Sequence, residues 1–429
     1  MRQVEQFIPS PKQRKVFKWW KDAAVKDKDG IICDGAIRSG KTHSMSFSFV
    51  IWAMENFAEE NFGMCGKTIG ALRRNVITPL KKMLLRHGYG VKERRAENLI
   101  IVSKGERVNY FYEFGGKDES SQDLIQGITL AGVFFDEVAL MPESFVNQAT
   151  GRCSVDGSKM WFNCNPEGPY HWFKTGWVDE HEEKNLIYLH FTMEDNPSLT
   201  ERIKERYRSM YVGVFFKRYV LGVWEKAEGL IYPMYADALA DTSKVKPEQI
   251  CVSIDYGTQN PFAALLWYKQ NGVWYAVKGY YYSGRGTGIQ KTDNDYLEDM
   301  RTFLKDEIYL REEQARTTQI REKIRVVIDP SAASFIALLR KDRWAKVVPA
   351  DNAVLDGIRD TATALQTGLI KISDSIEEWK MEASGYTWDD SVEDKPVKEN
   401  DHLMDAMRYF VTTNRIVRKA SGYTAIFDE

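Results

Sequence analysis

The sequence predicts a two-domain α/β protein, with a mostly parallel central sheet in the first domain and a mixed sheet in the second. Apolar strand patterns and helical patterns alternate from about residue 30 to residue 190, which indicates parallel strands covered by helices. After residue 250, three successive strands rich in Tyr and Val indicate an antiparallel meander. The chain has 429 residues, which is too long for one ordinary core. We therefore expect domains at 1–222 and 246–429, with a linker at 223–245, where Gly and Pro interrupt the pattern.

The first domain is expected to contain five buried strands, three main helices and one hairpin. The hairpin joins 98–103 to 107–114 through a short turn at Gly105. A strongly charged helix is expected over 199–208. The strands are expected at 30–33, 62–66, 131–135, 160–164 and 186–191, and the helices at 42–57, 69–87 and 142–149.

The second domain is expected to begin with its three-stranded meander and to end with a helix. A further buried strand is expected at 324–329, because four of the five residues that precede an aspartate there are apolar. The final helix is expected over 401–413, and the last ten or so residues are expected to form a mobile tail. The meander strands are expected at 250–255, 263–268 and 273–282.

Composition excludes several classes of protein. Hydrophobic residues make up 43% and charged residues 28% of the chain, as in soluble globular proteins. No apolar run approaches the roughly 18–20 residues of a membrane span, and no secretion signal is visible, so we expect a cytoplasmic protein without a membrane partner. The five scattered cysteines fit a reducing compartment and argue against a zinc site. Because the net charge is −2, any binding of DNA must come from local basic patches.

Residues 35–42 read Gly-Ala-Ile-Arg-Ser-Gly-Lys-Thr, a complete G-x-x-x-x-G-K-[ST] phosphate loop between an apolar strand and a helical pattern. Gly35 and Gly40 allow backbone N–H groups to turn towards phosphates, and the helix N-terminus adds partial positive charge. Lys41 can reach the outer phosphates, and the Thr42 hydroxyl can hold Mg²⁺. The loop therefore predicts binding of ATP with Mg²⁺.

A second motif completes this site. The strand 131–135 ends in Asp136 and Glu137, and the carboxyl end of a parallel strand faces the ligand crevice of an open α/β sheet. Asp136 is expected to hold Mg²⁺, directly or through water, and Glu137 to orient and deprotonate the attacking water. The pair therefore predicts hydrolysis of the bound nucleotide.

Five further positions are candidates for nucleotide contacts. Gln13 precedes an aromatic helix, and its amide can both donate to and accept from an adenine edge. Ser39 belongs to the phosphate loop itself, and Asn165, like Asn163, lies at the end of a predicted strand, where an amide could sense the γ-phosphate. Arg38, inside the loop, is a candidate for stabilising charge in the transition state.

The second domain carries a separate set of acids. Asp255 ends the first meander strand and Asp329 ends a later apolar strand. His402 and Asp405 lie three residues apart on the final helix, and Asp401 shares a face with Asp405. Carboxylates from two strands and one helix suit two hard cations, Mg²⁺ or Mn²⁺, that clamp the attacking and leaving oxygens of a phosphodiester. Their order along the chain is that of a ribonuclease-H-like nuclease, with Asp255, Asp329 and Asp405 as catalytic metal ligands and His402 as an additional ligand.

At this point the chain resembles the large terminase subunit of tailed bacteriophages. The resemblance implies a P-loop ATPase domain followed by a ribonuclease-H-like nuclease domain. It implies ATP-driven translocation of viral double-stranded DNA into a procapsid and endonucleolytic cutting of the concatemer. It also implies three partners besides DNA: a small terminase subunit, a portal protein and further copies of the chain in a homo-oligomeric ring. The motifs that carry it are 35–42, 134–137, 163–168, 195–197, 229–233, 254–257 and 401–409.

One departure from the family concerns the arginine that acts on a neighbour's ATP. Several relatives carry Arg-Gly shortly before the Asp-Glu strand, whereas this chain has Gln126-Gly127. The arginines that remain as unranked candidates for the transition state are Arg38, Arg73, Arg74 and Arg152.

Two functions other than that of a terminase remain as alternatives. One is a nucleotide-dependent switch or structural protein without DNA chemistry, and the other is a cellular repair translocase with nuclease activity.

Overall fold

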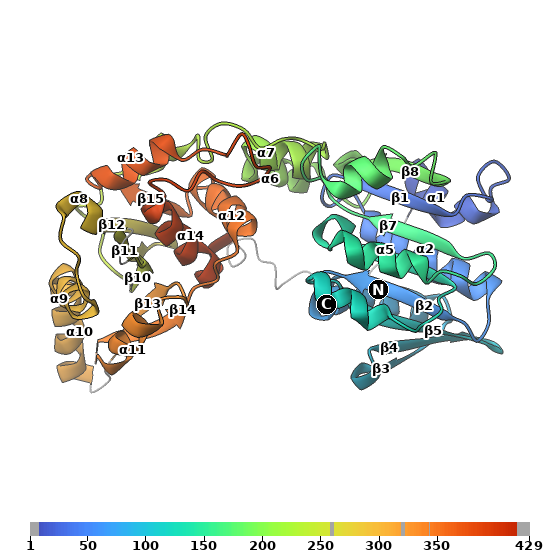
Figure 1. Ribbon diagram of the computed structural model, residues 1–429, viewed down its shortest axis with the longest axis horizontal. Coiled ribbons are helices and arrows are strands. Elements are labelled where there is room, and N and C mark those ends of the chain that lie inside the picture. The colour runs from blue at the N-terminus through green and yellow to red at the C-terminus, as the bar shows by residue number, and fades with distance from the viewer. Residues whose placement is uncertain (1–7, 258–260, 319–321, 343, 418–429) are drawn as a thin grey trace, which may run out of the picture. The chain divides into compact units, whose positions relative to one another are not determined.

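The computed structural model describes residues 8–257, 261–318, 322–342 and 344–417. The chain divides into two compact units, of which one comprises Met1–Arg208 and Val214–Lys226, and the other Ser209–Gly213 and Ala227–Glu429. Each unit contains one large β-sheet (Figure 1). The mobile tail expected for the last ten or so residues lies outside the described residues.

The segment 223–245, expected as a linker, is divided between the two units after Lys226. Its later part contains β9 (Leu239–Ala240), which pairs in parallel with β15 (Ile370–Ser373). Tyr232 in the same segment is fully buried, and its ring centroid lies 5.5 Å from that of Tyr386. Most of this segment is therefore packed into the second unit.

The sheet of the first unit has eight strands, and its central part is parallel. The strands are β1 (Gly30–Gly35), β2 (Asn61–Gly66), β3 (Gly90–Arg94), β4 (Leu99–Lys104), β5 (Arg107–Gly115), β6 (Gly132–Asp136), β7 (Lys159–Asn163) and β8 (Leu186–Phe191), in the order β3-β4-β5-β2-β6-β7-β1-β8. Among these described strands, only β3–β4 and β4–β5 are antiparallel pairs. The mostly parallel sheet and all five expected strands are confirmed, as is the hairpin β4–β5. β3 was not expected, because its residues Gly-Val-Lys-Glu-Arg form no apolar run.

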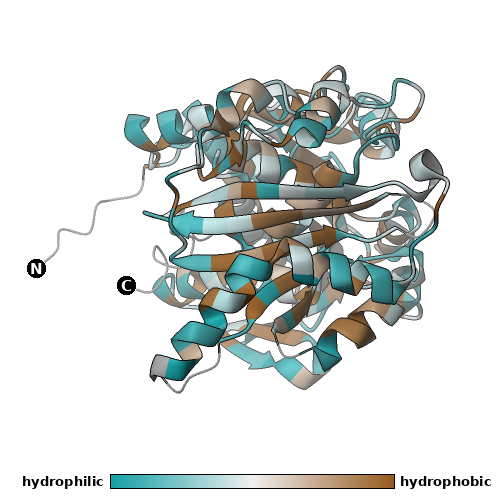
Figure 2. Cartoon of the chain, turned by 90° about the vertical axis from the view of Figure 1, so that its left-hand side faces the viewer, coloured by the Kyte–Doolittle hydropathy of each residue, from teal (hydrophilic) through white to brown (hydrophobic). Residues whose placement is uncertain are grey.

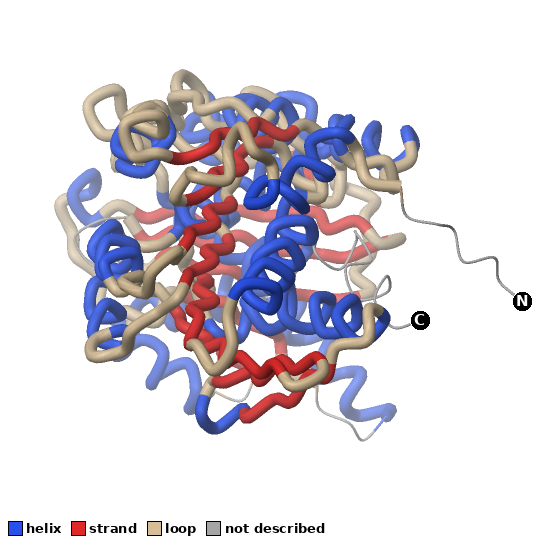
Figure 3. The backbone as a smooth tube through the Cα atoms, turned by 90° about the vertical axis from the view of Figure 1, so that its right-hand side faces the viewer, coloured by secondary structure: helices blue, strands red, loops and turns tan. Residues whose placement is uncertain are grey.

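Helices cover both faces of this sheet (Figure 3). The helices that pack on it are α1 (Pro11–Lys18), α2 (Lys41–Asn56), α3 (Ile69–Leu72), α4 (Thr78–Arg86) and α5 (Glu143–Gly151). Two more helices, α6 (Glu201–Met210) and α7 (Gly213–Phe215), follow β8 along the chain. The expected helix over 69–87 is interrupted, since a π-helical turn at Arg73–Ile77 separates α3 from α4. The expected helices at 42–57, 142–149 and 199–208 correspond to α2, α5 and α6.

An aromatic cluster fixes α2 against the sheet. The ring centroid of Trp161 on β7 lies 4.8 Å from that of Trp52, 5.2 Å from that of Phe49 and 5.1 Å from that of Trp19. Trp161 is fully buried, and its indole Nε1 donates to Ser48 Oγ at 3.1 Å. These contacts fix the helix that begins at the phosphate loop, so the loop rests on a rigid base.

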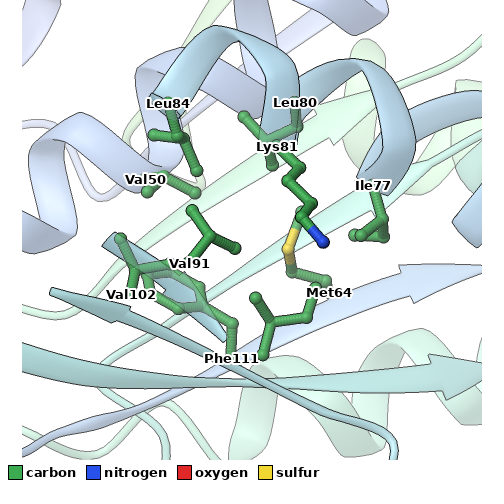
Figure 4. Close-up of a pocket in the computed structure, with 10 residues that line it drawn as sticks. Val50, Met64, Ile77, Leu80, Lys81, Leu84, Val91, Val102 and Phe111 are labelled. Carbon is green, nitrogen blue, oxygen red and sulfur yellow. The ribbon is translucent and has the colours of Figure 1, made fainter. Parts of the chain in front are cut away.

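A small apolar pocket lies on the same face of the sheet, beneath α4 (Figure 4). Its lining is aliphatic and aromatic except for Lys81, whose Nζ is 2.8 Å from Glu93 Oε1. The lining offers neither a carboxylate nor a turn of backbone N–H groups. The pocket is therefore a packing defect in the core rather than a candidate site for a nucleotide or a metal.

The sheet of the second unit has seven strands in mixed directions. Besides β9 and β15 they are β10 (Gln249–Asp255), β11 (Phe262–Gln270), β12 (Val273–Tyr282), β13 (Ile324–Ile328) and β14 (Ala345–Pro349), and the order is β14-β13-β10-β11-β12-β15-β9. β10–β11 and β11–β12 are antiparallel and the other pairs are parallel, which confirms the meander and the mixed sheet. The helices are α8 (Gly284–Thr287), α9 (Asp293–Phe303), α10 (Lys305–Thr318), α11 (Ala333–Lys341), α12 (Val354–Gln366), α13 (Glu377–Gly385) and α14 (His402–Asn414).

The final helix, α14, is buried against this sheet. Hydrophobic residues gather along the strands of the second unit in Figure 2, while its outer helices carry hydrophilic ones. Phe410 on α14 is fully buried and stacks on Trp267 of β11, with ring centroids 4.0 Å apart and planes within 5°. The position of α14 is thus set by aromatic packing near its carboxyl end.

Replacing Phe410 by Ala is expected to destabilise the second unit by about 3–5 kcal/mol, because the truncation leaves a cavity under Trp267. The measurement is urea unfolding of the full chain, with amide hydrogen exchange of α14 as the local readout. Tyr309→Ala, at a side chain that is 59% exposed, is the control and should change stability by less than about 0.5 kcal/mol. Unchanged exchange in α14 of the Phe410 variant would contradict this account.

Candidate functional site

The phosphate loop lies between β1 and α2, as the motif predicts. Gly35 has φ +122° and Gly40 has φ +85°, both in the region that favours glycine. A Cβ atom at Gly35 would lie 1.9 Å from the carbonyl oxygen of Phe191, and one at Gly40 would lie 2.5 Å from Gln13 Nε2. Both glycines are therefore required by the backbone and by close approach of neighbouring groups.

The Lys41 side chain is folded onto this loop. Its Nζ donates to the carbonyl oxygens of Gly35 at 2.9 Å and Ala36 at 2.7 Å. Nζ also lies 3.3 Å from Ser39 Oγ and 3.2 Å from Asn165 Oδ1. Burial lowers the pKa of Lys41 to about 8, although nearby acidic groups oppose the shift. The ammonium thus lies where a loop-bound phosphate would compete for it.

Thr42, Asp136 and Asn163 form a hydrogen-bonded triangle beside Lys41. Thr42 Oγ1 donates to Asp136 Oδ1 at 3.2 Å, and Asn163 Nδ2 lies 2.6 Å from the same oxygen and 2.9 Å from Thr42 Oγ1. Burial, followed by the charge of Glu137, raises the pKa of Asp136 to about 7. Asn163 Oδ1 is buried and has no hydrogen-bond partner among the described residues. The Thr42 hydroxyl and the Asp136 carboxylate lie within hydrogen-bond distance of each other, and both are oxygen donors of the kind that fits Mg²⁺.

Glu137 and Arg38 occupy strained backbone positions next to this triangle. Glu137 has φ +57° directly after β6, and Arg38 has φ +58° inside the phosphate loop. The Arg38 guanidinium lies 5.6 Å from the ring centroid of Tyr207, and its carbonyl oxygen accepts from Asn196 Nδ2 at 2.6 Å. Such strain is maintained only where the surrounding structure fixes the conformation, as at functional loops.

Gln13 lies at the same loop, with its residue only 2% exposed. Its Oε1 accepts from the backbone N–H of Ser10 at 2.9 Å, which completes a capping box at the start of α1. Its Nε2 faces Gly40, as the close approach above shows. The amide therefore connects the first helix to the phosphate loop.

The other candidate arginines differ in how they are held. Arg73 is committed within the chain, because its Nε donates to buried Glu113 at 2.6 Å and its Nη2 to Asn98 at 2.9 Å. Arg74 is exposed in the π-helical turn, and Arg152 forms the C-cap of α5. Arg73 is therefore held by side chains of its own chain.

Sequence reasoning missed a buried acid directly before the phosphate loop. Asp34 is fully buried, and its carboxylate accepts from Tyr188 Oη at 2.9 Å, His190 Nδ1 at 2.9 Å and Trp224 Nε1 at 2.6 Å. In addition, the backbone N–H of Ile37 donates to the carbonyl oxygen of Tyr219 at 2.9 Å. The segment around Trp224 therefore braces the loop. The signal that could have revealed Asp34 is its position directly after the apolar run 31–33 and before the phosphate loop.

The acids of the second unit meet at the carboxyl ends of two neighbouring strands. β10 and β13 are parallel with Ile254 opposite Ile328, so Asp255 and Asp329, the next residue along each strand, lie level. α14 is bonded to both acids. His402 Nδ1 lies 2.9 Å from Asp255 Oδ2, and Tyr409 Oη donates to Asp329 Oδ2 at 3.1 Å.

Asp405 is paired with cations on both of its carboxylate oxygens. Arg408 donates to Oδ1 through Nη2 at 2.8 Å and through Nε at 3.2 Å. Lys398 Nζ donates to Oδ2 at 3.1 Å and also to Asp401 Oδ2 at 2.9 Å. Arg408 is buried, and its Nη1 donates to the carbonyl oxygens of Asn352 and Ala353.

The environment shifts the pKa values of this cluster in different directions. Burial, with the charge of Asp405, raises the pKa of Asp255 despite its bond to His402. Burial alone would raise the pKa of Asp329, but hydrogen bonds, first from Ser331 and then from Tyr409, together lower it. Burial opposes protonation of His402, yet its bond to Asp255 and the charge of that carboxylate raise the His402 pKa.

Among the described residues, no three His, Cys, Asp or Glu side chains already converge as a metal cage. The reason is visible at each acid, since Asp255 is turned to His402 and Asp405 to Arg408 and Lys398. The donor set itself fits hard divalent cations, because carboxylates from β10, β13 and α14 share one edge of the sheet.

Sequence reasoning also missed the groups that hold this cluster in place. Glu382 on α13 is buried, and its Oε2 accepts from the backbone N–H groups of Leu403 at 2.7 Å and Met404 at 3.3 Å, so it caps α14. Burial raises the pKa of Glu382 to about 7. Arg408 lies inside the recognised motif 401–409 but was given no role, and Lys398 lies in a polar loop that carries no pattern.

Comparison with known proteins identifies both units. Residues 32–235 match the family model for the N-terminal part of the terminase large subunit, T4likevirus-type, and residues 255–413 match that for the terminase RNaseH-like domain. The large terminase of a thermophilic bacteriophage is 58% identical, with 95% of this chain and 99% of that chain covered and a TM-score of 0.88. This chain belongs to the large terminase family.

Two further structures of the large terminase from that thermophilic bacteriophage hold nucleotides. The complex with ADP is 57% identical to this terminase chain, covers 95% of it and 99% of its own length, and has a TM-score of 0.85. The complex with ATP-gamma-S is 55% identical, with 94% and 98% covered and a TM-score of 0.84. No curated protein sequence matches the chain.

The family assignment confirms the expected enzyme class. This terminase has an ATPase domain followed by a ribonuclease-H-like nuclease domain, and it is an enzyme. Nothing in the comparisons favours a structural switch protein or a cellular repair translocase. None of the described helices is both long and apolar enough to cross a bilayer.

Replacing Asp34 by Asn is expected to destabilise the first unit by about 1–3 kcal/mol, because the new NH₂ group would face donors such as Trp224 Nε1. The measurement is urea unfolding of the full chain, with hydrogen exchange of β1 and the phosphate loop as the local readout. Asp27→Asn, at an exposed position before β1, is the matched control. Equal protection of the loop in both variants would show that Asp34 does not brace it.

Proposed function

We propose that this terminase uses ATP hydrolysis to move viral double-stranded DNA into a procapsid and cuts the DNA concatemer with a metal-dependent endonuclease. The observation that carries the proposal is that one chain holds two separate clusters at strand ends. One joins Lys41 and Thr42 to Asp136, and the other joins Asp255 and Asp329 through α14. The first suits a nucleoside triphosphate and the second suits a phosphodiester.

In the ATPase site, ATP is the proposed nucleotide, since related structures hold ADP and ATP-gamma-S. Backbone N–H groups of the loop from Gly35 to Gly40, including Ser39, surround the phosphates, and Lys41 moves from the loop carbonyls to the outer phosphates. Thr42 and Asp136 hold Mg²⁺, which neutralises charge on the phosphate oxygens.

The remaining groups of this site act on the attacking water, the γ-phosphate, the adenine base and the charge that develops in the transition state. Glu137 orients and deprotonates the attacking water. Asn165, which is bonded to Lys41, detects whether the γ-phosphate is present. Gln13 contacts the adenine edge, and Arg38 is a candidate for stabilising transition-state charge.

In the nuclease site, Asp255, Asp329 and Asp405 are the proposed ligands of Mg²⁺ or Mn²⁺, with His402 as an additional ligand. Bound cations of this kind activate water and stabilise the leaving oxygen. Asp255 and Asp329 present their carboxylates from level positions on adjacent strands. Arg408 orients Asp405, and Glu382 fixes the start of α14.

The family also suggests the setting in which these activities operate. We propose that double-stranded DNA, a small terminase subunit and a portal protein are partners, and that copies of this chain form a ring on the procapsid. Action in the cytoplasm of the bacterial host follows from the same proposal. Position 126 is a glutamine, so it cannot supply an arginine to a neighbour's ATP. In a ring, another arginine of the neighbouring copy would supply this charge.

Glu137→Gln is expected to leave ATP binding intact and to reduce hydrolysis by roughly 10²–10⁴-fold, because the amide cannot accept the proton of water. The measurement combines steady-state ATPase rates with titration of a fluorescent ATP analogue. Exposed Glu143→Gln, early in α5, is the control. Turnover near the wild-type rate in the Glu137 variant would refute its role as the base.

Asp255→Asn is expected to abolish cleavage of supercoiled plasmid in Mn²⁺ while ATPase activity is retained, because the two clusters belong to separate units. Asp241→Asn, at an exposed position in the same unit, is the control. If both activities were lost together in a folded Asp255 variant, the assignment of two independent sites would be wrong.

A further inference from the structure

We propose that Lys398 is a tethered counter-ion of the nuclease site, which competes with a divalent cation for Asp405 and Asp401. The proposal rests on the proposed function of these acids and names how that site is regulated. In the structure the Lys398 ammonium bridges the two carboxylates, at 3.1 Å from Asp405 Oδ2 and 2.9 Å from Asp401 Oδ2.

The two cations on Asp405 are not equivalent. Arg408 has a side chain that is 3% exposed, and it is held by the backbone carbonyls of Asn352 and Ala353 as well as by Asp405 Oδ1. Moving it would leave these buried groups without their partner. The Lys398 side chain is 56% exposed and extends from a polar loop. Lys398 is therefore the cation that can leave.

The carboxylates that Lys398 bridges are buried more deeply than Lys398 itself. The side chains of Asp401 and Asp405 are 7% and 12% exposed. An ion pair between two exposed side chains contributes little, but a cation that serves two buried carboxylates offsets their loss of hydration. Removing the ammonium without replacement is consequently costly, whereas exchanging it for another cation is not.

The rest of the neighbourhood supports an exchange of cations. His402, with a side chain that is 16% exposed, is the partner of Asp255, so it does not neutralise Asp405. Glu382 adds a further buried acid at the start of α14. With several acids around one edge, the pair Asp401–Asp405 needs positive charge whether or not a metal is bound. A divalent cation that takes Asp405 Oδ2 must displace Lys398, and the displaced ammonium moves into solvent on its loop.

This competition has a clear consequence for metal affinity. The free energy of metal binding contains the cost of breaking both Lys398 contacts, so removing the ammonium should tighten binding. A methionine at this position keeps the length of the side chain and removes the charge. An arginine keeps the charge and should retain the competition.

The test measures Mn²⁺ binding to the full chain without nucleotide, by the electron paramagnetic resonance signal of free Mn²⁺. Asp255→Asn serves as the reference for ions bound elsewhere. Lys398→Met is expected to bind Mn²⁺ about tenfold more tightly than wild type, which corresponds to about 1.4 kcal/mol. Lys398→Arg should stay near wild type, and the Mn²⁺ concentration for half-maximal plasmid cleavage should fall in proportion for the methionine variant.

Lys395→Met is the matched control, because Lys395 is exposed on the same loop and carries the same charge. Tighter binding in both methionine variants would indicate a general effect of net charge and would overturn the proposal. Unchanged or weaker binding in Lys398→Met would overturn it as well, and weaker DNA binding in Ca²⁺ would then assign Lys398 to DNA phosphates. If wild type bound no more Mn²⁺ than Asp255→Asn and cut no plasmid, the nuclease site itself would be refuted.

Discussion

Buried charge at the carboxyl ends of strands is the constraint on which both sites of this terminase depend. Parallel strands bring their carboxyl ends to one edge, so polar groups at or just after the ends of β1, β6 and β7, or of β10 and β13, are forced together. An unpaired charge in such a place would cost several kcal/mol. Each unit therefore surrounds its acids with fixed donors. The Asp34 carboxylate accepts hydrogen bonds from Tyr188, His190 and Trp224. The Asp405 carboxylate accepts hydrogen bonds from Arg408.

The fixed donors differ from a second group of partners that a ligand could replace. Lys41 is held by the carbonyl oxygens of its own loop, and Lys398 holds two acids from an exposed loop. Lysine suits this role, because a single ammonium on a flexible stem can change partners without rearranging the backbone. Arginine suits the fixed role, because its planar fork engages Asp405 and two carbonyls at once.

Much of the fold could be predicted because the buried strands are short apolar runs, as in β1 and β13, and because turns and helix starts have local signals. β3 could not be predicted, since a strand at a sheet edge with alternating exposure needs no apolar run. The phosphate loop and the acids at strand ends were visible as local patterns. The partners that satisfy them, such as Trp224 for Asp34, come from distant segments, and no local pattern encodes such a contact.

Both proposed sites are already internally satisfied, so binding at either is an exchange rather than an addition. At the ATPase site a phosphate must interact with Lys41 more favourably than the oxygens of Gly35, Ala36 and Asn165 do. At the nuclease site a cation must interact with Asp405 more favourably than the Lys398 ammonium does. The measured affinity in each case is therefore a difference between two sets of contacts, and it is smaller than the new contacts alone would give. The same difference favours the correct ligand, because a weaker anion or a monovalent cation gains too little to displace the internal partner.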